Sequence, residues 1–231
     1  MSNQEKHSCV DCGVYNCHTR DKSYPDFCLT TELSEAEKEE VWNLYAEEEN
    51  QKVSVVSAQI ESDFYLRYTR VQEIVAFAKR MGYHRIGIAT CVGLIEESRI
   101  FAQILRKNGF EVYGALCKVG SFDKTRVGVP EKDTEITGGV MCNPILQAKL
   151  LNREKTDFNV VVGLCVGHDS LFYKYADALC TTLVTKDRVM GHNPVAALYQ
   201  TRSYYSRLKN ETIPAYPEAQ VSQEEFADKE I

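Results

Sequence analysis

The chain has 231 residues, of which 44% are hydrophobic and 26% are charged, and its net charge is −6. This composition is that of a globular protein with one full-sized domain and a small appended element. The negative charge speaks against a nucleic-acid-binding protein, which needs a basic surface. No apolar run approaches the roughly 18 residues of a membrane span, and the first nine residues lack the apolar stretch of a signal peptide, so we expect a cytoplasmic protein.

The first segment, residues 1–32, is rich in cysteine and has little apolar periodicity. Its cysteines are Cys9, Cys12, Cys17 and Cys28. A Cys-x2-Cys pair lets two sulfurs bind one metal from a single turn, and two more cysteines complete a four-sulfur set suited to Zn²⁺ or an iron–sulfur cluster. The alternative is a set of unrelated free thiols. Because the segment cannot hold a shape by burial, we predict a metal centre that organises it.

Three helices are predicted next. Ser34 and Glu37 form a capping box that opens the first helix. The segment 53–68 fits a helix better than a strand, because its apolar residues recur at helical intervals. A second capping box, at Thr69 and Gln72, opens the third helix.

From there the chain alternates between short apolar strands and helices. Strands are predicted at residues 85–91, 111–118, 159–165 and 181–185, and helices at 94–108, from Asn143, from Asp169 or Ser170 to 178, and from Asn193. This alternation predicts an α/β fold, with an open, mostly parallel sheet of four to five strands and helices on both faces. The long stretch 119–141 interrupts the pattern, and it is either a lid over a site or a solvated insertion.

The predicted organisation therefore has three parts. Residues 1–32 form a small cysteine-rich metal-knuckle segment, and residues 33–210 form the α/β domain. Residues 211–231 hold two prolines and six carboxylates with little periodicity, which is typical of a loose acidic tail.

Four more cysteines recur at regular intervals within the α/β pattern. Cys91, Cys117, Cys142 and Cys165 are 26, 25 and 23 residues apart. Three of them fall at or near predicted strand ends, and Cys142 precedes a helix start. In a parallel sheet all these positions share the carboxyl edge, where ligands bind, so we predict a second, cofactor-binding site. The alternative is that each is a small core residue, which is our interpretation of Cys180, at the start of a strand.

Two histidines adjoin the same edge. His168 could act as a further ligand or proton donor near Cys165, or belong to the helix-start turn, and His192 could belong to the site or to a turn. A helix start also stabilises a thiolate at Cys142. No G-x-G-x-x-G follows any predicted strand, so nothing favours a dinucleotide.

With these motifs, the chain resembles a family of uncharacterised, predicted metal-binding proteins. The family is classed as a domain of unknown function and is found mainly in anaerobic bacteria and archaea. The resemblance covers nearly all of residues 9–208. It is carried by Cys9-Val-Asp-Cys12-Gly13, by Ile86-Gly-Ile-Ala-Thr-Cys91, by Cys117-Lys-Val-Gly120, by Met141-Cys-Asn-Pro144, by Gly163-Leu-Cys-Val-Gly-His-Asp169 and by Asp187-Arg-Val-Met-Gly-His-Asn-Pro194. The anaerobic distribution of the family implies iron–sulfur clusters rather than zinc.

The leading hypothesis is therefore an iron–sulfur redox protein or enzyme, with 4Fe-4S the expected cluster type. It would have one four-cysteine site near the amino terminus and a second thiolate site at the strand ends. One alternative is a zinc-stabilised binding or sensor module whose strand-end cysteines are mostly core. The other is a thiol enzyme that acts through Cys142. A redox partner or a small-molecule ligand is the expected partner, and neither nucleic acid nor a membrane is expected.

Overall fold

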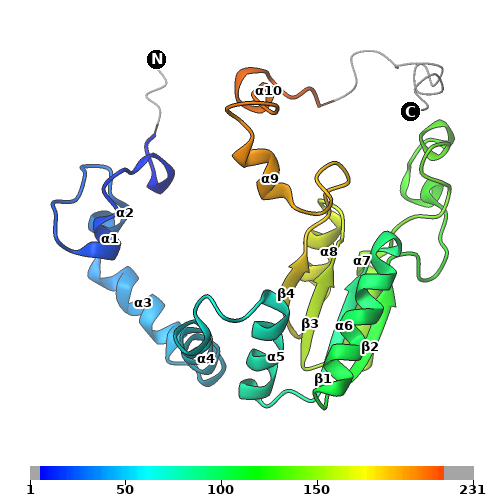
Figure 1. Cartoon of the computed structure of the whole chain (residues 1–231), viewed down its shortest axis with the longest axis horizontal. Coiled ribbons are helices and arrows are strands. Elements are labelled where there is room, and N and C mark those ends of the chain that lie inside the picture. The colour runs from blue at the N-terminus through cyan, green and yellow to red at the C-terminus, as the bar shows by residue number, and fades with distance from the viewer. Residues whose placement is uncertain (1–5, 216–231) are drawn as a thin grey trace. The chain divides into compact units, whose positions relative to one another are not determined.

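The computed structural model describes residues 6–215. The chain divides into two compact units, Met1–Tyr68 and Thr69–Ile231 (Figure 1). The cysteine-rich segment therefore shares a unit with the helices that follow it. The predicted boundaries after residues 32 and 210 stay predictions, and the predicted tail lies outside the described residues from 216 onward. In the described part of the chain, no helix is long and apolar enough to cross a membrane.

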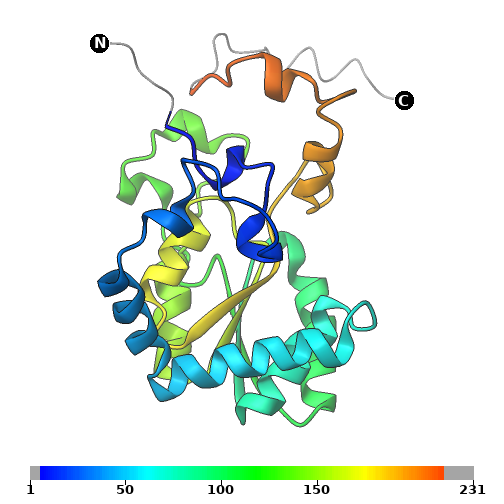
Figure 2. The ribbon, with the colours of Figure 1, turned by 90° about the vertical axis from the view of Figure 1, so that its left-hand side faces the viewer.

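The first unit consists of short helical turns and two longer helices (Figure 2). Its elements are η1 (Cys9–Asp11), α1 (Asn16–Thr19), α2 (Leu29–Glu32), α3 (Glu35–Tyr45) and α4 (Glu48–Phe64). The Ser34 hydroxyl accepts the Glu37 N–H, and the Glu37 carboxylate accepts the Ser34 N–H at 2.8 Å. This pair confirms the predicted capping box. Helix α4 confirms that the ambiguous segment 53–68 is mainly helical, although the helix begins five residues earlier.

The second unit is built on a sheet of four parallel strands in the order β2-β1-β3-β4. The strands are β1 (Arg85–Thr90), β2 (Glu111–Leu116), β3 (Phe158–Val162) and β4 (Leu179–Val184). They confirm the predicted α/β fold with a parallel sheet. Strand β3 ends three residues before its predicted end at Cys165, because Gly163 adopts a left-handed conformation with φ +70° and turns the chain out of the sheet.

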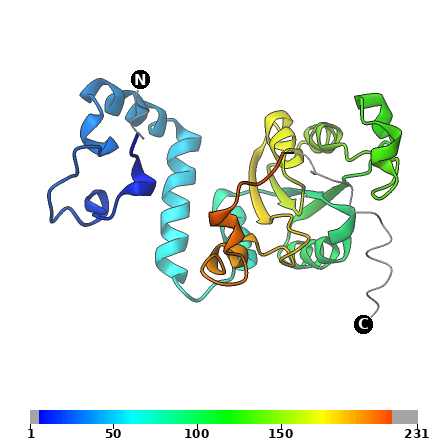
Figure 3. The ribbon, with the colours of Figure 1, turned by 90° about the horizontal axis from the view of Figure 1, so that it is seen from above.

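Helices cover both faces of this sheet (Figure 3). The helices of the unit are α5 (Arg70–Met81), α6 (Ile95–Lys107), α7 (Pro144–Arg153), α8 (His168–Tyr175), α9 (Pro194–Tyr199) and α10 (Arg207–Asn210), with 3-10 turns η2 (Val92–Leu94), η3 (Lys124–Val127) and η4 (Glu131–Thr134). Helices α5 and α6 pack on one face around Ile86 and Val160, and α7 and α8 pack on the other around Leu151 and Phe172. Helix α8 begins after Gly167, not at the predicted caps Asp169 or Ser170.

The connections create a switch point in the sheet. Helix α6, between β1 and β2, covers one face, and α7, between β2 and β3, covers the other. Helix α8, which follows β3, lies on the same face as α7, so the neighbouring strands β1 and β3 are followed by helices on opposite faces. The crevice of such a sheet lies outside the carboxyl ends of these two strands. In open parallel sheets ligands bind at this point.

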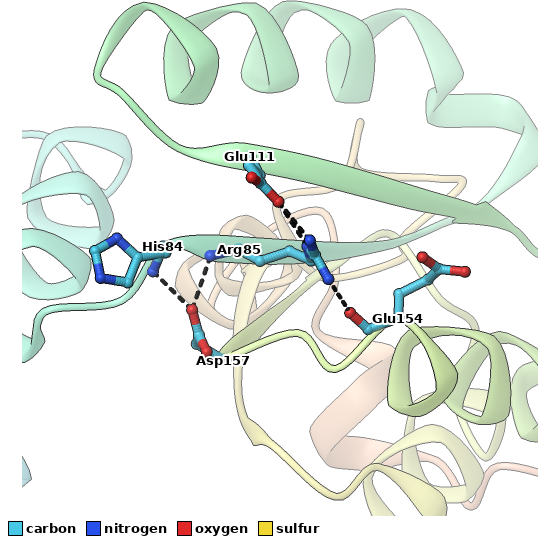
Figure 4. Close-up of polar contacts among 5 residues, drawn as sticks. All are labelled: His84, Arg85, Glu111, Glu154 and Asp157. Atoms are coloured by element: carbon cyan, nitrogen blue, oxygen red, sulfur yellow. Dashed lines mark hydrogen bonds and ion pairs between the residues drawn. The ribbon is translucent and has the colours of Figure 1, made fainter.

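The amino edge of the sheet is closed by polar contacts around Arg85 (Figure 4). The Arg85 guanidinium donates to the Glu111 carboxylate at 2.6 and 2.8 Å and to the Glu154 carbonyl at 2.6 Å. Hydrogen bonding to Glu111 raises the pKa of Arg85. The Asp157 carboxylate accepts the backbone N–H groups of His84 and Arg85 at 2.6 and 2.8 Å. These contacts tie together the starts of β1, β2 and β3, so the opposite edge is the one open to a ligand.

Candidate functional site

Two of the predicted site cysteines stand side by side at neighbouring strand ends. Cys91 directly follows β1, and Cys117 directly follows β2. The two strands are in register up to Thr90 and Leu116, and the Cys117 N–H donates to the Thr90 carbonyl at 2.8 Å. The Cys91 N–H donates to the Val162 carbonyl of β3 at 3.0 Å. Backbone pairing therefore fixes Cys91 at the switch point between β1 and β3, and Cys117 beside it at the end of β2.

The approach of helix α7 brings a third cysteine to this pair. The Asn143 N–H donates to the Cys117 carbonyl at 2.7 Å, and the Asn143 side chain caps α7 by accepting the Leu146 N–H at 3.1 Å. Cys142 is thereby held beside Cys117. The Cys117 thiol interacts with the thiols of both Cys91 and Cys142, and its Sγ accepts the Val92 N–H at 3.3 Å. Three of the four predicted sulfurs thus form a continuous chain, with Cys117 in the centre.

The protonation of this chain follows from its neighbours. Hydrogen bonding from Cys117 and from His168 lowers the pKa of Cys142 to about 4. Hydrogen bonding from Cys117, from the Gly93 N–H and from Lys186 lowers the pKa of Cys91 to about 5. The hydrogen bonds to both neighbours, together with burial, raise the pKa of Cys117 itself. The pKa values of the two outer thiols are therefore lowered and that of the central thiol is raised. Because Cys117 carries one proton, it can donate to only one of the two outer sulfurs at a time.

The fourth predicted cysteine, Cys165, reaches the same cavity by a different route. The prediction that it ends β3 is wrong, because it lies in the turn between β3 and α8. Its sulfur accepts a hydrogen bond from the Arg188 guanidinium at 3.1 Å. Within residues 6–215 its recorded sulfur contact is with Arg188, and the three-thiol chain does not extend to it. Cys165 therefore lines the same cavity as Cys91 and Cys142, with its sulfur held by Arg188.

A cavity of about 850 Å³ opens over these sulfurs. Cys91, Cys142 and Cys165 line it, whereas Cys117 is buried beneath them at 2% exposure. The stretch 119–141 supplies part of the wall, and it is organised by a bridge between Asp123 and Val140. The stretch that the sequence left open as lid or insertion therefore borders the predicted site.

The amino-terminal cysteines also gather around one pocket. All four of the predicted metal ligands, Cys9, Cys12, Cys17 and Cys28, line a pocket of about 90 Å³. Buried Asn16 closes the loop between them, since its Nδ2 donates to the Lys22 carbonyl at 2.6 Å and its Oδ1 accepts the Lys22 N–H at 2.8 Å.

Neither group of sulfurs is arranged as a finished metal site. Across residues 6–215, no three His, Cys, Asp or Glu side chains stand in positions that would hold a metal ion. The metal-binding role of both groups therefore stays a prediction. Cys180 lies within β4, half-buried against the core, and burial raises its pKa to about 11. This position agrees with its interpretation as a core residue.

Several contributors to the site escaped the sequence analysis. Lys186 and Arg188 reach Cys91 and Cys165 from the loop after β4, and their only signal was their position just past a strand end. Gln147 of α7 is fully buried, and its Nε2 donates to the carbonyls of Thr90 at 3.1 Å and of Ala115 at 2.7 Å. A polar residue on the apolar face of a helix was the signal for it.

The two histidines are both part of the cavity wall. His168 is hydrogen-bonded to Cys142, which raises the pKa of its imidazole. His192 also lines the cavity, and its Nδ1 accepts the Asp187 N–H at 3.1 Å, so it serves the turn as well. The interaction of His168 is thus with Cys142, and not with Cys165, near which it was predicted.

Comparison with known proteins gives one family and one close relative. The family described as "Protein of unknown function (DUF1847)" matches residues 28–183. This stretch includes the four edge cysteines, which are Cys91, Cys117, Cys142 and Cys165. The Uncharacterized protein MJ0455 of Methanocaldococcus jannaschii is 42% identical over 205 residues, which cover 87% of this chain and 97% of the relative.

Among solved structures, the chain is similar to the crystal structure of Dph2 from Pyrococcus horikoshii with 4Fe-4S cluster. The TM-score is 0.33 and the identity 17%, and the alignment covers 62% of this chain and 33% of the Dph2 chain. The chain thus spans about a third of that protein. A likeness at this level carries no argument about cofactor or activity.

Proposed function

We propose a function for this chain from the arrangement of its own side chains. The chain belongs to the family described as "Protein of unknown function (DUF1847)". The protein is an iron–sulfur redox protein or enzyme whose principal cluster is held at the carboxyl edge of the sheet. The observation that carries this proposal is the chain of sulfurs from Cys91 through buried Cys117 to Cys142, whose two outer members line a cavity.

The chemistry of the donor set fits such a cluster. Thiolates are soft ligands that select iron–sulfur clusters, zinc or copper(I) over hard cations. Neighbouring donors lower the pKa of Cys91 and Cys142, which favours the thiolate form that binds metals. The cationic side chains of Lys118, Lys186 and Arg188 line the same cavity and would offset the negative charge of a thiolate-bound cluster.

The assignment of ligands follows from position. Cys91, Cys117 and Cys142 would hold the cluster, and Cys165, which lines the same cavity, would supply a fourth sulfur. A bound cluster would supply electron transfer to or from a molecule in that cavity. The pocket lined by the four amino-terminal cysteines would hold a second metal centre, either an iron–sulfur cluster or zinc.

One specific contact favours a second candidate function, a thiol enzyme. His168 is hydrogen-bonded to Cys142, and the pKa of this thiol is lowered to about 4, which is the arrangement of an activated cysteine nucleophile. In that case Cys142 would attack an electrophilic substrate in the cavity, and Cys91 and Cys117 would serve only as core residues.

Anaerobic purification followed by reconstitution with ferrous iron and sulfide tests the proposal. Iron, acid-labile sulfide, zinc and the visible spectrum should be measured on the full chain. We expect a brown protein, and we expect Cys142→Ser and Cys117→Ser to lose the iron of the edge cluster. Cys180→Ser is the matched control, because this half-buried thiol lies outside the cavity, and it should keep the full iron content.

Each outcome separates the candidates. A protein that remains colourless after reconstitution would exclude the iron–sulfur proposal. Zinc that disappears in Cys12→Ser but persists in Cys142→Ser would leave a metal only in the amino-terminal pocket. Selective alkylation of Cys142 at neutral pH in a colourless protein would favour the thiol enzyme.

A further inference from the structure

The charge of the large cavity is opposite to that of the whole protein. The chain carries a net charge of −6, yet the titratable side chains that line the cavity, besides its cysteines, are all cations or imidazoles. They are Lys118, Lys124, Lys186, Arg188, His168 and His192, and no aspartate or glutamate of the described residues joins them. A low-dielectric hollow lined by one sign of charge concentrates molecules of the opposite sign.

The sulfur atoms of the site contact only two of the four cationic side chains of the cavity. Lys186 hydrogen-bonds to Cys91 and Arg188 to Cys165. The Nζ of Lys118 donates to the Val140 carbonyl at 2.6 Å, and that of Lys124 donates to the Thr137 hydroxyl. These two acceptors are neutral oxygens. None of the four cations forms an ion pair with a carboxylate between residues 6 and 215.

The rest of the wall is apolar. Val127, Val129, Met141, Ile145 and Leu171 line the cavity together with the cations. A volume of about 850 Å³ lies within the range of pockets for drug-sized ligands, which are mostly apolar with a few placed polar groups. A small inorganic ion would leave most of this volume and all of the apolar wall unused.

We infer that the cavity binds a small organic anion, with its carboxylate or phosphate group on Lys118 and Lys124 and its apolar part against the valine and leucine side chains of the wall. The inference deepens the proposed function and rests on it for the role of the ligand, which would lie beside the cluster-binding thiolates as the molecule that exchanges electrons or reacts there. The binding of the anion itself needs only the lysines and the apolar wall.

Calorimetric titration of the full, anaerobically reduced chain tests the inference. The probes are benzoate for the carboxylate class, phenyl phosphate for the phosphate class, and benzamide as the neutral counterpart of benzoate. We expect saturable binding of at least one anion and about tenfold weaker binding of benzamide, since a hydrogen bond to a charged group contributes enough for that factor. The tighter anion identifies the class of ligand.

Three variants locate the binding site. Lys124→Gln and Lys118→Gln should each weaken binding of the anion by about tenfold. Lys132→Gln is the matched control, because Lys132 lies in the same stretch 119–141 but is exposed and does not line the cavity, so it should bind as the unaltered protein does. Equal binding of benzamide and benzoate, equal effects of Lys132→Gln and Lys124→Gln, or the absence of saturable binding by both anions would overturn the inference.

The visible spectrum of the same samples keeps this outcome separate from that of the proposed function. A cluster-loaded protein that binds neither anion would refute the anion site and leave the iron–sulfur proposal standing. A colourless protein that binds an anion through Lys124 would establish the anion site and refute the cluster.

Discussion

Cys142 is surrounded by groups that favour its thiolate. The Cys117 thiol and His168 hydrogen-bond to it, and the charge of Lys118 acts in the same direction. Together they outweigh partial burial, which alone would raise the pKa, and bring it to about 4. A thiol with a lowered pKa remains charged, and hence nucleophilic, at pH values where ordinary thiols are protonated.

The first prediction concerns the pH dependence of this thiol in metal-free, reduced protein. The rate of alkylation of Cys142 by iodoacetamide should stay nearly constant from about pH 8 down to about pH 6, because its thiolate fraction falls only as the pH approaches 4. An ordinary thiol with a pKa of about 8.5 loses about tenfold in rate for each pH unit over the same range. Mass spectrometry of quenched samples gives the rate for each cysteine.

Two comparisons sharpen this measurement. Cys180, whose pKa burial raises to about 11, should be slow throughout and should speed up as the pH rises. In His168→Gln the alkylation of Cys142 should begin to slow at a higher pH than in the unaltered protein. A tenfold loss per pH unit for Cys142 in the unaltered protein would contradict the thiolate assignment.

At the scale of elements, helix α7 holds the strand ends through Gln147. Its amide donates to the carbonyls of Thr90 and Ala115, one at the end of β1 and one near the end of β2. Gln147→Leu would leave both buried carbonyls without this donor, and we expect a loss of about 2 kcal/mol in the free energy of unfolding. Urea denaturation measures the loss. The Cys117 thiol should also react faster with iodoacetamide, because the strand ends around it loosen.

Gln103→Leu is the control for this substitution. Gln103 lies exposed on α6, so the same change of side chain there should alter the unfolding midpoint little. If both variants unfold at the same urea concentration as the unaltered protein, Gln147 does not hold the strand ends.

Strand β1 depends on a glycine for its packing against α7. A Cβ at Gly87 would overlap the Oδ1 of Asn159 and lie 2.9 Å from the Leu151 Cδ1. Asn159 and Leu151 are fully buried, so neither can move aside freely. Gly87→Ala should therefore destabilise the protein by about 2 kcal/mol, measured as a lower midpoint of thermal unfolding.

The neighbouring strand offers a matched position. A Cβ at Gly114 of β2 would have the Ile88 carbonyl as its nearest neighbour, at 3.9 Å, which is ordinary contact. Gly114→Ala should therefore leave the unfolding midpoint nearly unchanged. A Gly87→Ala protein as stable as Gly114→Ala would contradict the overlap.

At the scale of the whole molecule, what the sequence predicts depends on how local the cause is. The capping boxes at Ser34 and Thr69 were predictable because their hydrogen bonds join residues three apart. The gathering of the edge cysteines was predictable because parallel strands share one carboxyl edge. The early end of β3 was not, because it depends on the left-handed conformation of Gly163, where a side chain would overlap Leu94 from another element.

The contacts of charged side chains could not be predicted from the sequence either. Nothing in the residues around Lys186 and Arg188 indicates which sulfur each one would contact, since that depends on how the loop after β4 folds back over the cavity. The positive charge of the cavity is therefore a property of the assembled fold, hidden in a chain whose total charge is negative.

The two units differ in what holds them together. The second unit has two clusters of buried apolar residues, one on each face of its sheet. Between residues 6 and 33, Asn16 is the one buried residue, and it is polar. If the four cysteines of this segment bind a metal as proposed, the free energy of metal binding contributes directly to the free energy of folding.

The last prediction follows from this difference. Removal of metal by a chelator under reducing conditions should let trypsin cleave within residues 6–33, at Arg20 or Lys22. Residues 69–117 and 142–184, which form the two buried clusters, should remain resistant because their stability comes from burial. The double variant Cys12→Ser/Cys17→Ser should be cleaved at the same sites without a chelator, and Cys180→Ser should behave as the unaltered protein. Mass spectrometry of the fragments identifies each cut. Equal resistance of residues 6–33 with and without metal would show that the segment holds its shape without the four sulfurs, and the amino-terminal metal centre would then lose its physical rationale.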